Sequence, residues 1–176
     1  MIIRLSQKLC TKIKAGSLTT MPLDTNPFAD WSAHLFVADR RQYIIISNTK
    51  SLYSALMSGK GKTNASQFIE RAMSSIREFM EADRQQFIYR RFIAPVSGSG
   101  CFAKPLDRTV TGSMNELILH ARTMLTEGEM SLHDIGISLN DVLLSAIAPS
   151  KSQKYGKPRE VFKNLLSESK QKQATS

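Results

Sequence analysis

The stretch DRTVTGSMNEL, at residues 107–117, carries the polar side chains best suited to hold a negatively charged group. Arg108 supplies a planar guanidinium that can clamp a phosphate or a carboxylate through two parallel hydrogen bonds. Gly112 lets a ligand approach the backbone closely. A helix is predicted to begin just after Ser113, and the free N–H groups of a helix start carry a partial positive charge. We therefore predict an anion-binding site over residues 108–115.

The candidate ligand-binding residues come from this stretch and from an earlier segment, DWSAHL. They are Arg108, Thr109, Gly112, Ser113, Asn115, Trp31 and His34. The pattern favours a non-catalytic binding domain that recognises an anionic group on a nucleic acid, a phosphorylated ligand or an acidic partner protein. For Trp31 a structural interpretation competes with this one, because a large aromatic side chain usually packs in the core.

A second hypothesis gives His34 a catalytic role. An imidazole can act as a general base near neutral pH, and Arg108 could stabilise the negative charge that develops in a phosphodiester reaction. The chain would then be a small metal-independent nuclease or phosphodiesterase. The structural alternative is a hydrogen-bonded histidine packed beside Phe36. The other two histidines, His120 and His133, have no metal-ligand spacing, so we predict neither a metal nor a cofactor.

The segment GKGKT, at residues 59–63, resembles part of a phosphate-binding P-loop between a strand and a helix. The full motif requires a further glycine at the position of Leu56, and without it the loop cannot wrap its N–H groups around the phosphates. We interpret the segment as a lysine-rich turn at the start of a helix, and not as the site of a nucleotide hydrolase.

The formal net charge of +9 is concentrated at the two ends of the chain. Residues 1–14 hold four basic side chains and no acidic one, and residues 151–176 hold seven basic side chains and two acidic ones. The intervening residues are neutral overall. The ends could attract a nucleic acid or an acidic protein without sequence specificity, or they could serve only as solvated segments.

The apolar content of 41% and the charged content of 22% are typical of a globular protein. No apolar run reaches the roughly 18 residues that a membrane span requires. Charges interrupt the apolar residues of the first 14 positions, unlike those of a signal peptide. We therefore expect a cytoplasmic protein that does not bind membranes.

Alternating apolar residues predict the strands. Residues 2–5 form a short strand, and residues 32–57 read as three strands separated by the turns ADRRQ and NTK. The predicted fold class is α+β, with a small antiparallel sheet made of a three-stranded meander and the N-terminal strand, packed against several helices. If the strands of the meander are exposed, they could pair across a homo-oligomer, which gives a third functional hypothesis, an oligomeric interaction protein.

Apolar residues at helical spacing predict the helices. One spans about 64–81, a second begins after a capping box formed by Ser113 and Glu116, a third follows Ser131, and the last begins at Pro158. We assign residues 1–166 to a single domain. The polar segment 167–176 is predicted to be a disordered basic tail.

Three segments resemble a family of uncharacterised bacterial proteins known as a domain of unknown function. The matching residues are Ser6, Gln7, Lys8 and Leu9; Asp30, Trp31, Ala33, His34 and Leu35; and Asp107, Arg108, Val110, Gly112, Ser113, Met114, Asn115 and Glu116. The segments SLHDIGISLN and YGKPREVF are similar to the family's C-terminal part, so the resemblance covers nearly the whole chain. It implies one compact intracellular α+β domain, and it implies no activity, cofactor or catalytic residue.

Overall fold

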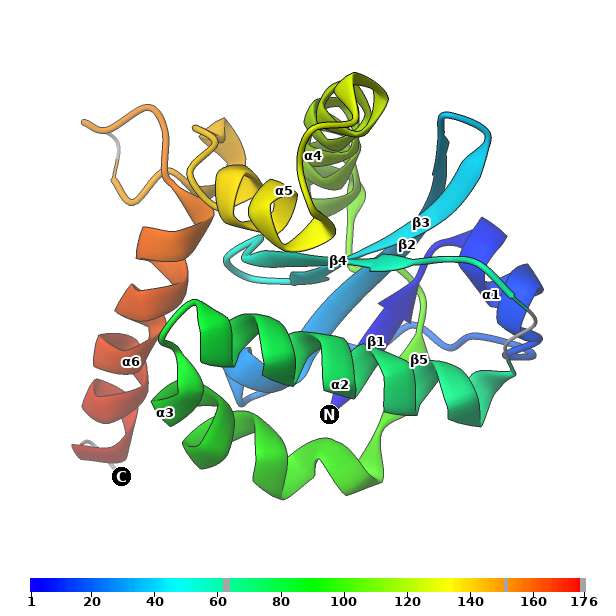
Figure 1. Cartoon of the computed structure of the whole chain (residues 1–176). Helices are drawn as coiled ribbons and strands as arrows, with labels where there is room; N and C mark the ends of the chain where they lie inside the picture. Colours follow the sequence, from blue (N-terminus) through cyan, green and yellow to red (C-terminus); the bar gives the residue numbers. More distant parts are fainter. Residues whose placement is uncertain (62–63, 151, 175–176) are drawn as a thin grey trace.

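The computed structural model describes residues 1–61, 64–150 and 152–174, which form one sheet with helices on both of its faces (Figure 1). The strands are β1 (Ile2–Leu5), β2 (Asp30–Ala38), β3 (Arg41–Asn48), β4 (Ser54–Ser58) and β5 (Cys101–Ala103). The helices are α1 (Gln7–Ile13), α2 (Ala65–Ala82), α3 (Gln86–Ile88), α4 (Arg108–Glu127), α5 (Leu132–Leu139) and α6 (Pro158–Ala174). Short 3-10 or π turns lie at Pro27–Ala29, Tyr89–Ile93, Ala94–Ser99 and Ser145–Ile147.

The sheet is mixed, so the predicted small antiparallel sheet is wrong. Its strand order is β4-β3-β2-β1-β5. β2, β3 and β4 pair antiparallel in succession, whereas β1 pairs parallel to both β2 and β5. The chain crosses over through α1 between β1 and β2, and it returns to β5 only after α2 and α3. A four-residue apolar strand such as IIRL does not encode the direction in which it pairs, because its side-chain alternation is the same in both cases.

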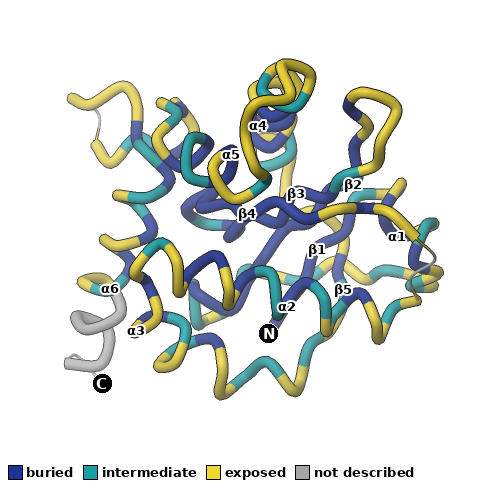
Figure 2. Tube along the Cα trace, viewed as in Figure 1, coloured by how far each residue is buried: buried dark blue, intermediate teal, exposed yellow. Residues whose placement is uncertain are grey.

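Two apolar cores lie on opposite faces of the sheet, as the dark central strands of Figure 2 indicate. Trp31 and Ala33 of β2 face the core that includes residues of α1, α2 and α6. Phe36 and Ala38 of the same strand face the core that includes residues of α4 and α5. β2 is therefore buried on both faces along most of its length; Leu35 is partly exposed and Val37 is exposed.

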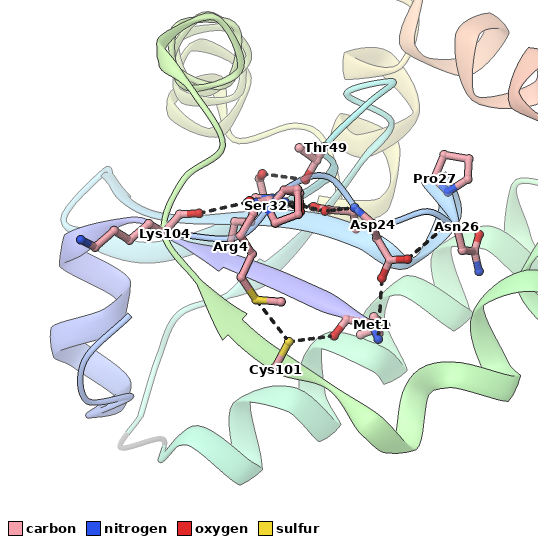
Figure 3. A network of polar contacts seen from close by, with 12 residues as sticks. Met1, Arg4, Asp24, Asn26, Pro27, Ser32, Thr49, Cys101 and Lys104 are labelled. Carbon is pink, nitrogen blue, oxygen red and sulfur yellow. Dashed lines mark hydrogen bonds and ion pairs between the residues drawn. The ribbon is translucent and has the colours of Figure 1, made fainter. Parts of the chain in front are cut away.

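Arg4 is a buried residue, although the sequence places it among the basic residues of the N-terminal end. Its side chain is 1% exposed and pairs with the fully buried Asp30 through two hydrogen bonds of 2.8 and 2.7 Å. The same guanidinium donates to the carbonyl groups of Met21 and Pro22. It also donates to the carbonyl group of Lys104, which lies beside Arg4 in Figure 3. Arg4 thereby fixes the loop between α1 and β2 against the sheet, and its charge is not available to a partner.

Helix α6 is held at its start by a polar network. Arg159 forms an ion pair with Asp83, and the Tyr53 hydroxyl donates to the other oxygen of the same carboxylate at 2.6 Å. Phe162 stacks on Tyr53, with ring centroids 4.4 Å apart. Residues 175 and 176 lie outside the described residues, and the disorder of 167–176 stays a prediction. Within the described ranges, no helix is both long enough and apolar enough to cross a bilayer.

Candidate functional site

The predicted start of α4 is wrong. The helix begins at Arg108, and the carboxylate of Asp107 caps it by accepting a hydrogen bond of 2.8 Å from the Val110 N–H group. Ser113 therefore lies inside the helix, where its hydroxyl donates to the Thr109 carbonyl at 3.0 Å, and it does not form a capping box. The sequence suggests a later start because Ser113 and Glu116 have the spacing of a capping box, but Asp107 is the residue that caps the helix.

This geometry bears directly on the predicted anion site. The N-terminal end of a helix attracts anions, but at the start of α4 the Asp107 carboxylate already occupies this position. Arg108, Thr109, Gly112 and Asn115 are exposed along the first two turns of the helix. In the described part of the chain, Arg108 has no ion-pair partner. The assignment of 108–115 as a site stays a prediction.

Trp31 and His34 are buried, so they are not part of the exposed surface at the start of α4. Trp31 is 1% exposed, and its indole N–H donates to the Phe28 carbonyl at 2.8 Å. His34 is 6% exposed and lies opposite Ile45 in the sheet. Burial lowers the pKa of His34 to about 4, so the imidazole is neutral at pH 7. A base with so low a pKa is poorly matched to catalysis near neutral pH, and no described hydrogen bond joins it to α4.

A pocket of about 840 Å³ lies at the opposite end of α4 from the predicted site. We call it the hairpin pocket, because the turn between β2 and β3 forms one wall. Its lining includes three cationic side chains, two polar ones and four apolar or aromatic ones: Arg40, Arg41 and Lys60; Gln42 and Ser58; Tyr43, Leu125, Met130 and Leu132. Among the described residues, no Asp or Glu lines it. None of the seven predicted site residues lines it either.

The turn that presents the two arginines is conformationally strained. Ala38 pairs with Arg41, so Asp39 and Arg40 form a two-residue hairpin turn, and both have positive φ values of 43° and 58°. This geometry favours Asn-Gly or Asp-Gly, so Asp39 suits the first position, whereas the left-handed region costs an arginine about 1–2 kcal/mol at the second. An arginine at the second turn position is therefore unfavourable for folding alone, and such outliers concentrate at functional sites.

Lys60 reaches the hairpin pocket because the end of β4 lies close to the start of β3. The Gly59 N–H group donates to the Gln42 carbonyl at 2.8 Å. A Cβ atom at Gly59 would lie only 3.0 Å from the Gln42 carbonyl carbon, so a larger residue would force the Gln42 backbone to shift by a few tenths of an ångström. On the other side, a guanidinium nitrogen of Arg71 donates to the Ser58 carbonyl at 2.7 Å and holds the strand end in place.

Both cationic turns are visible in the sequence as ADRRQ and GKGKT, but their juxtaposition is not. It follows from the antiparallel register, in which Tyr43 pairs with Ser58. In a meander, the turn before one strand and the turn after the next lie at the same end of the sheet. This rule predicts that the two cationic turns lie together. It does not predict the third wall of the pocket, which the end of α4 supplies. Residues 62 and 63 of GKGKT lie outside the described residues.

The fold and this surface define an α+β domain with a mixed five-stranded sheet and a basic pocket at one end. In the described ranges, no three His, Cys, Asp or Glu side chains lie together as metal ligands would. A family model described as Domain of unknown function (DUF6933) matches residues 2–161, and the chain belongs to this family. A search of curated proteins finds no match.

Proposed function

We propose that this chain is a binding domain for a phosphate-bearing anionic ligand, which it holds in the hairpin pocket. The observation that carries the proposal is the convergence of Arg40, Arg41 and Lys60, from two separate turns, on one pocket that no described carboxylate lines. Bringing three cations together is unfavourable without a counter-charge. A bound phosphate would supply that charge and form charge-assisted hydrogen bonds with the arginines.

Among the described residues, the nearby carboxylates neither line the pocket nor pair with its cations. Asp39, Glu127 and Glu129 flank lining residues along the chain, yet none forms an ion pair with a described basic side chain. The C-terminal end of α4, at Gly128, contributes a partial negative charge of about half an elementary charge. That offsets only a fraction of the three positive charges, so the groups that line the pocket together attract an anion.

The opposite wall of the pocket suits the organic part of a ligand. Tyr43 is half-buried, and its ring stacks on Phe36 with centroids 5.8 Å apart. Leu125, Met130 and Leu132 extend this apolar surface. Ligand pockets typically combine such a surface with a few convergent polar groups and have volumes of about 300–1,000 Å³. A nucleotide, with a flat base and a charged phosphate, has this combination of properties.

Calorimetric titration with ATP and with inorganic pyrophosphate tests the proposal. The triple variant Arg40→Gln/Arg41→Gln/Lys60→Gln should bind ATP at least tenfold more weakly than the wild type, since about 1.4 kcal/mol corresponds to a factor of ten. The matched control Arg90→Gln/Lys154→Gln/Lys163→Gln removes the same charge from exposed positions elsewhere and should change the affinity less than threefold. Equal losses in the two variants would reduce the effect to net charge and would contradict a specific pocket.

The sequence-based site at 108–115 makes a competing claim on the same ligand, and Arg108→Ala separates the two. If the hairpin pocket is the site, this variant binds ATP like the wild type, because Arg108 does not line the pocket. If Arg108→Ala abolishes binding while the triple variant retains it, the site lies at the start of α4, as the sequence predicts. Thermal unfolding of each variant shows whether it is folded.

A further inference from the structure

A second basic recess adjoins the hairpin pocket. It has a volume of about 460 Å³ and lies between α1, the end of β2 and α4, and we call it the α1 groove. Lys8 and Arg122 line it, and Gln42 lines both this groove and the hairpin pocket. Among the described residues, no Asp or Glu lines the groove. The two recesses therefore meet at the β2–β3 hairpin.

Internal hydrogen bonds hold Arg122 of the α1 groove, and Lys12 of α1, near the hairpin. The Lys12 ammonium donates to the Gln42 side-chain oxygen at 2.6 Å. β1 ends at Leu5, opposite Ala33, so among the described residues this edge of β2 has no strand partner beyond that point. There the Val37 carbonyl accepts a hydrogen bond of 3.1 Å from the Arg122 side chain. In the described ranges, the two terminal guanidinium nitrogens of Arg122 have no protein partner.

The cations that surround the hairpin come from four separate elements: Lys8 and Lys12 of α1, Arg40 and Arg41 of the turn, Lys60 after β4, and Arg122 of α4. A mononucleotide would occupy one recess and leave the cations of the other without a counter-charge. A ligand with phosphates repeated along a chain would contact both recesses. The arrangement thus fits a polyanion better than a single phosphate group.

We infer that the ligand of this surface is a single-stranded nucleic acid, which follows the hairpin from the hairpin pocket into the α1 groove; this inference rests on the proposed function. Single-strand-binding proteins combine a basic groove with aromatic side chains on which bases stack, and one stacked base contributes about 1–3 kcal/mol. Tyr43 offers such a ring in the hairpin pocket, and Val37, which is 50% exposed, adds an apolar contact in the α1 groove. A duplex keeps its bases paired and stacked inside, so its bases cannot lie on these walls.

Fluorescence anisotropy tests the inference on the full chain. The probes are labelled oligothymidylate and oligouridylate of about twelve nucleotides, within the usual site size of about 4–16 nucleotides, together with a duplex of equal length. The single strands should bind at least tenfold more tightly than both the duplex and ATP. Their affinity should fall with salt concentration, with a logarithmic slope of about −3 if about four phosphates are contacted. The DNA and RNA probes show which sugar is preferred.

The variant Lys8→Gln/Arg122→Gln distinguishes this inference from the proposed function. Both side chains line the α1 groove and neither lines the hairpin pocket, so ATP should bind as in the wild type, while the oligonucleotide affinity should fall at least tenfold. The control Lys154→Gln/Lys163→Gln should change the oligonucleotide affinity less than threefold. If ATP binds but the oligonucleotide binds no tighter, if the duplex binds equally well, or if the α1-groove variant has no effect, the inference is wrong and the proposed function stands. If neither ATP nor the oligonucleotide binds, both are wrong.

Discussion

The two ends of β2 place aspartate and arginine in opposite environments. At the first end, Asp30 is fully buried and pairs with Arg4 in a bidentate geometry. At the last end, Asp39 and Arg40 are exposed in a strained turn, and neither has an ion-pair partner in the described part of the chain. In the first case the charges satisfy each other and fix the fold. In the second they have no counter-charge within the described part of the fold, so the comparison links one end to stability and the other to the proposed binding site.

Removal of the buried guanidinium should have the largest effect on stability. In Arg4→Ala, the Asp30 carboxylate stays buried without its counter-charge, and loss of one partner of a buried pair typically costs about 3–5 kcal/mol. Urea denaturation should show this loss, whereas Arg41→Ala should change the free energy of unfolding by less than about 0.5 kcal/mol because the side chain is exposed. Similar losses in both variants would remove the contrast between the two ends.

His34, in the middle of β2, should make stability depend on pH. Its pKa is about 4 in the folded protein, below the ordinary value of 6.5, so the unfolded chain binds the proton more readily. Its contribution to stability is complete above about pH 6.5 and is lost as the pH falls toward 4. The two pKa values differ by about 2.5, and each pKa unit corresponds to about 1.4 kcal/mol, so the loss should be about 3 kcal/mol by pH 4.

Denaturation curves from pH 7 to pH 4, compared between the wild type and His34→Gln, measure this effect. Carboxylates also titrate near the lower limit, but both proteins share them, so the difference between the two curves isolates the imidazole. Parallel curves would show that His34 is accessible to protons in the folded state. That result would reopen the catalytic hypothesis, which needs a titratable His34 near neutral pH.

The sequence predicts the position of most strands and helices because those elements have a strong apolar periodicity. It does not predict how the elements combine. The parallel pairing of β1 depends on the crossover that follows it, and the position of Arg4 depends on a carboxylate 26 residues away. A count of charges treats Arg4 and Arg40 alike, although one is buried and the other is exposed. The basic pocket also depends on strand register, which brings two turns together.

Arg40→Gly tests the turn that follows β2, and we expect this variant to be more stable than the wild type. A glycine adopts the left-handed conformation without steric cost, so the variant should be more stable by about 1 kcal/mol, while ATP binding should weaken because a cation is lost. Arg40→Lys is the matched control, since it keeps both the charge and the strain. An opposite change in stability and binding is the expected signature of a residue retained for function. A variant that gains stability and binds normally would show that Arg40 is not part of the site.

Asp107→Ala should have the smallest effect on the free energy of unfolding. It tests whether the start of α4 serves only stability, like the first end of β2, or also binds a ligand, as proposed for the last end. The carboxylate caps the helix through the Val110 N–H group, and loss of an N-cap costs about 1 kcal/mol. If residues 108–115 only begin a helix, chemical denaturation should show this loss and calorimetry should show unchanged ATP binding. If the start of α4 is instead an anion site from which Asp107 excludes the ligand, the variant should bind ATP more tightly, because the competing carboxylate is gone. A gain that Arg108→Ala then abolishes would place the ligand at the start of α4 and would leave the hairpin pocket without a role.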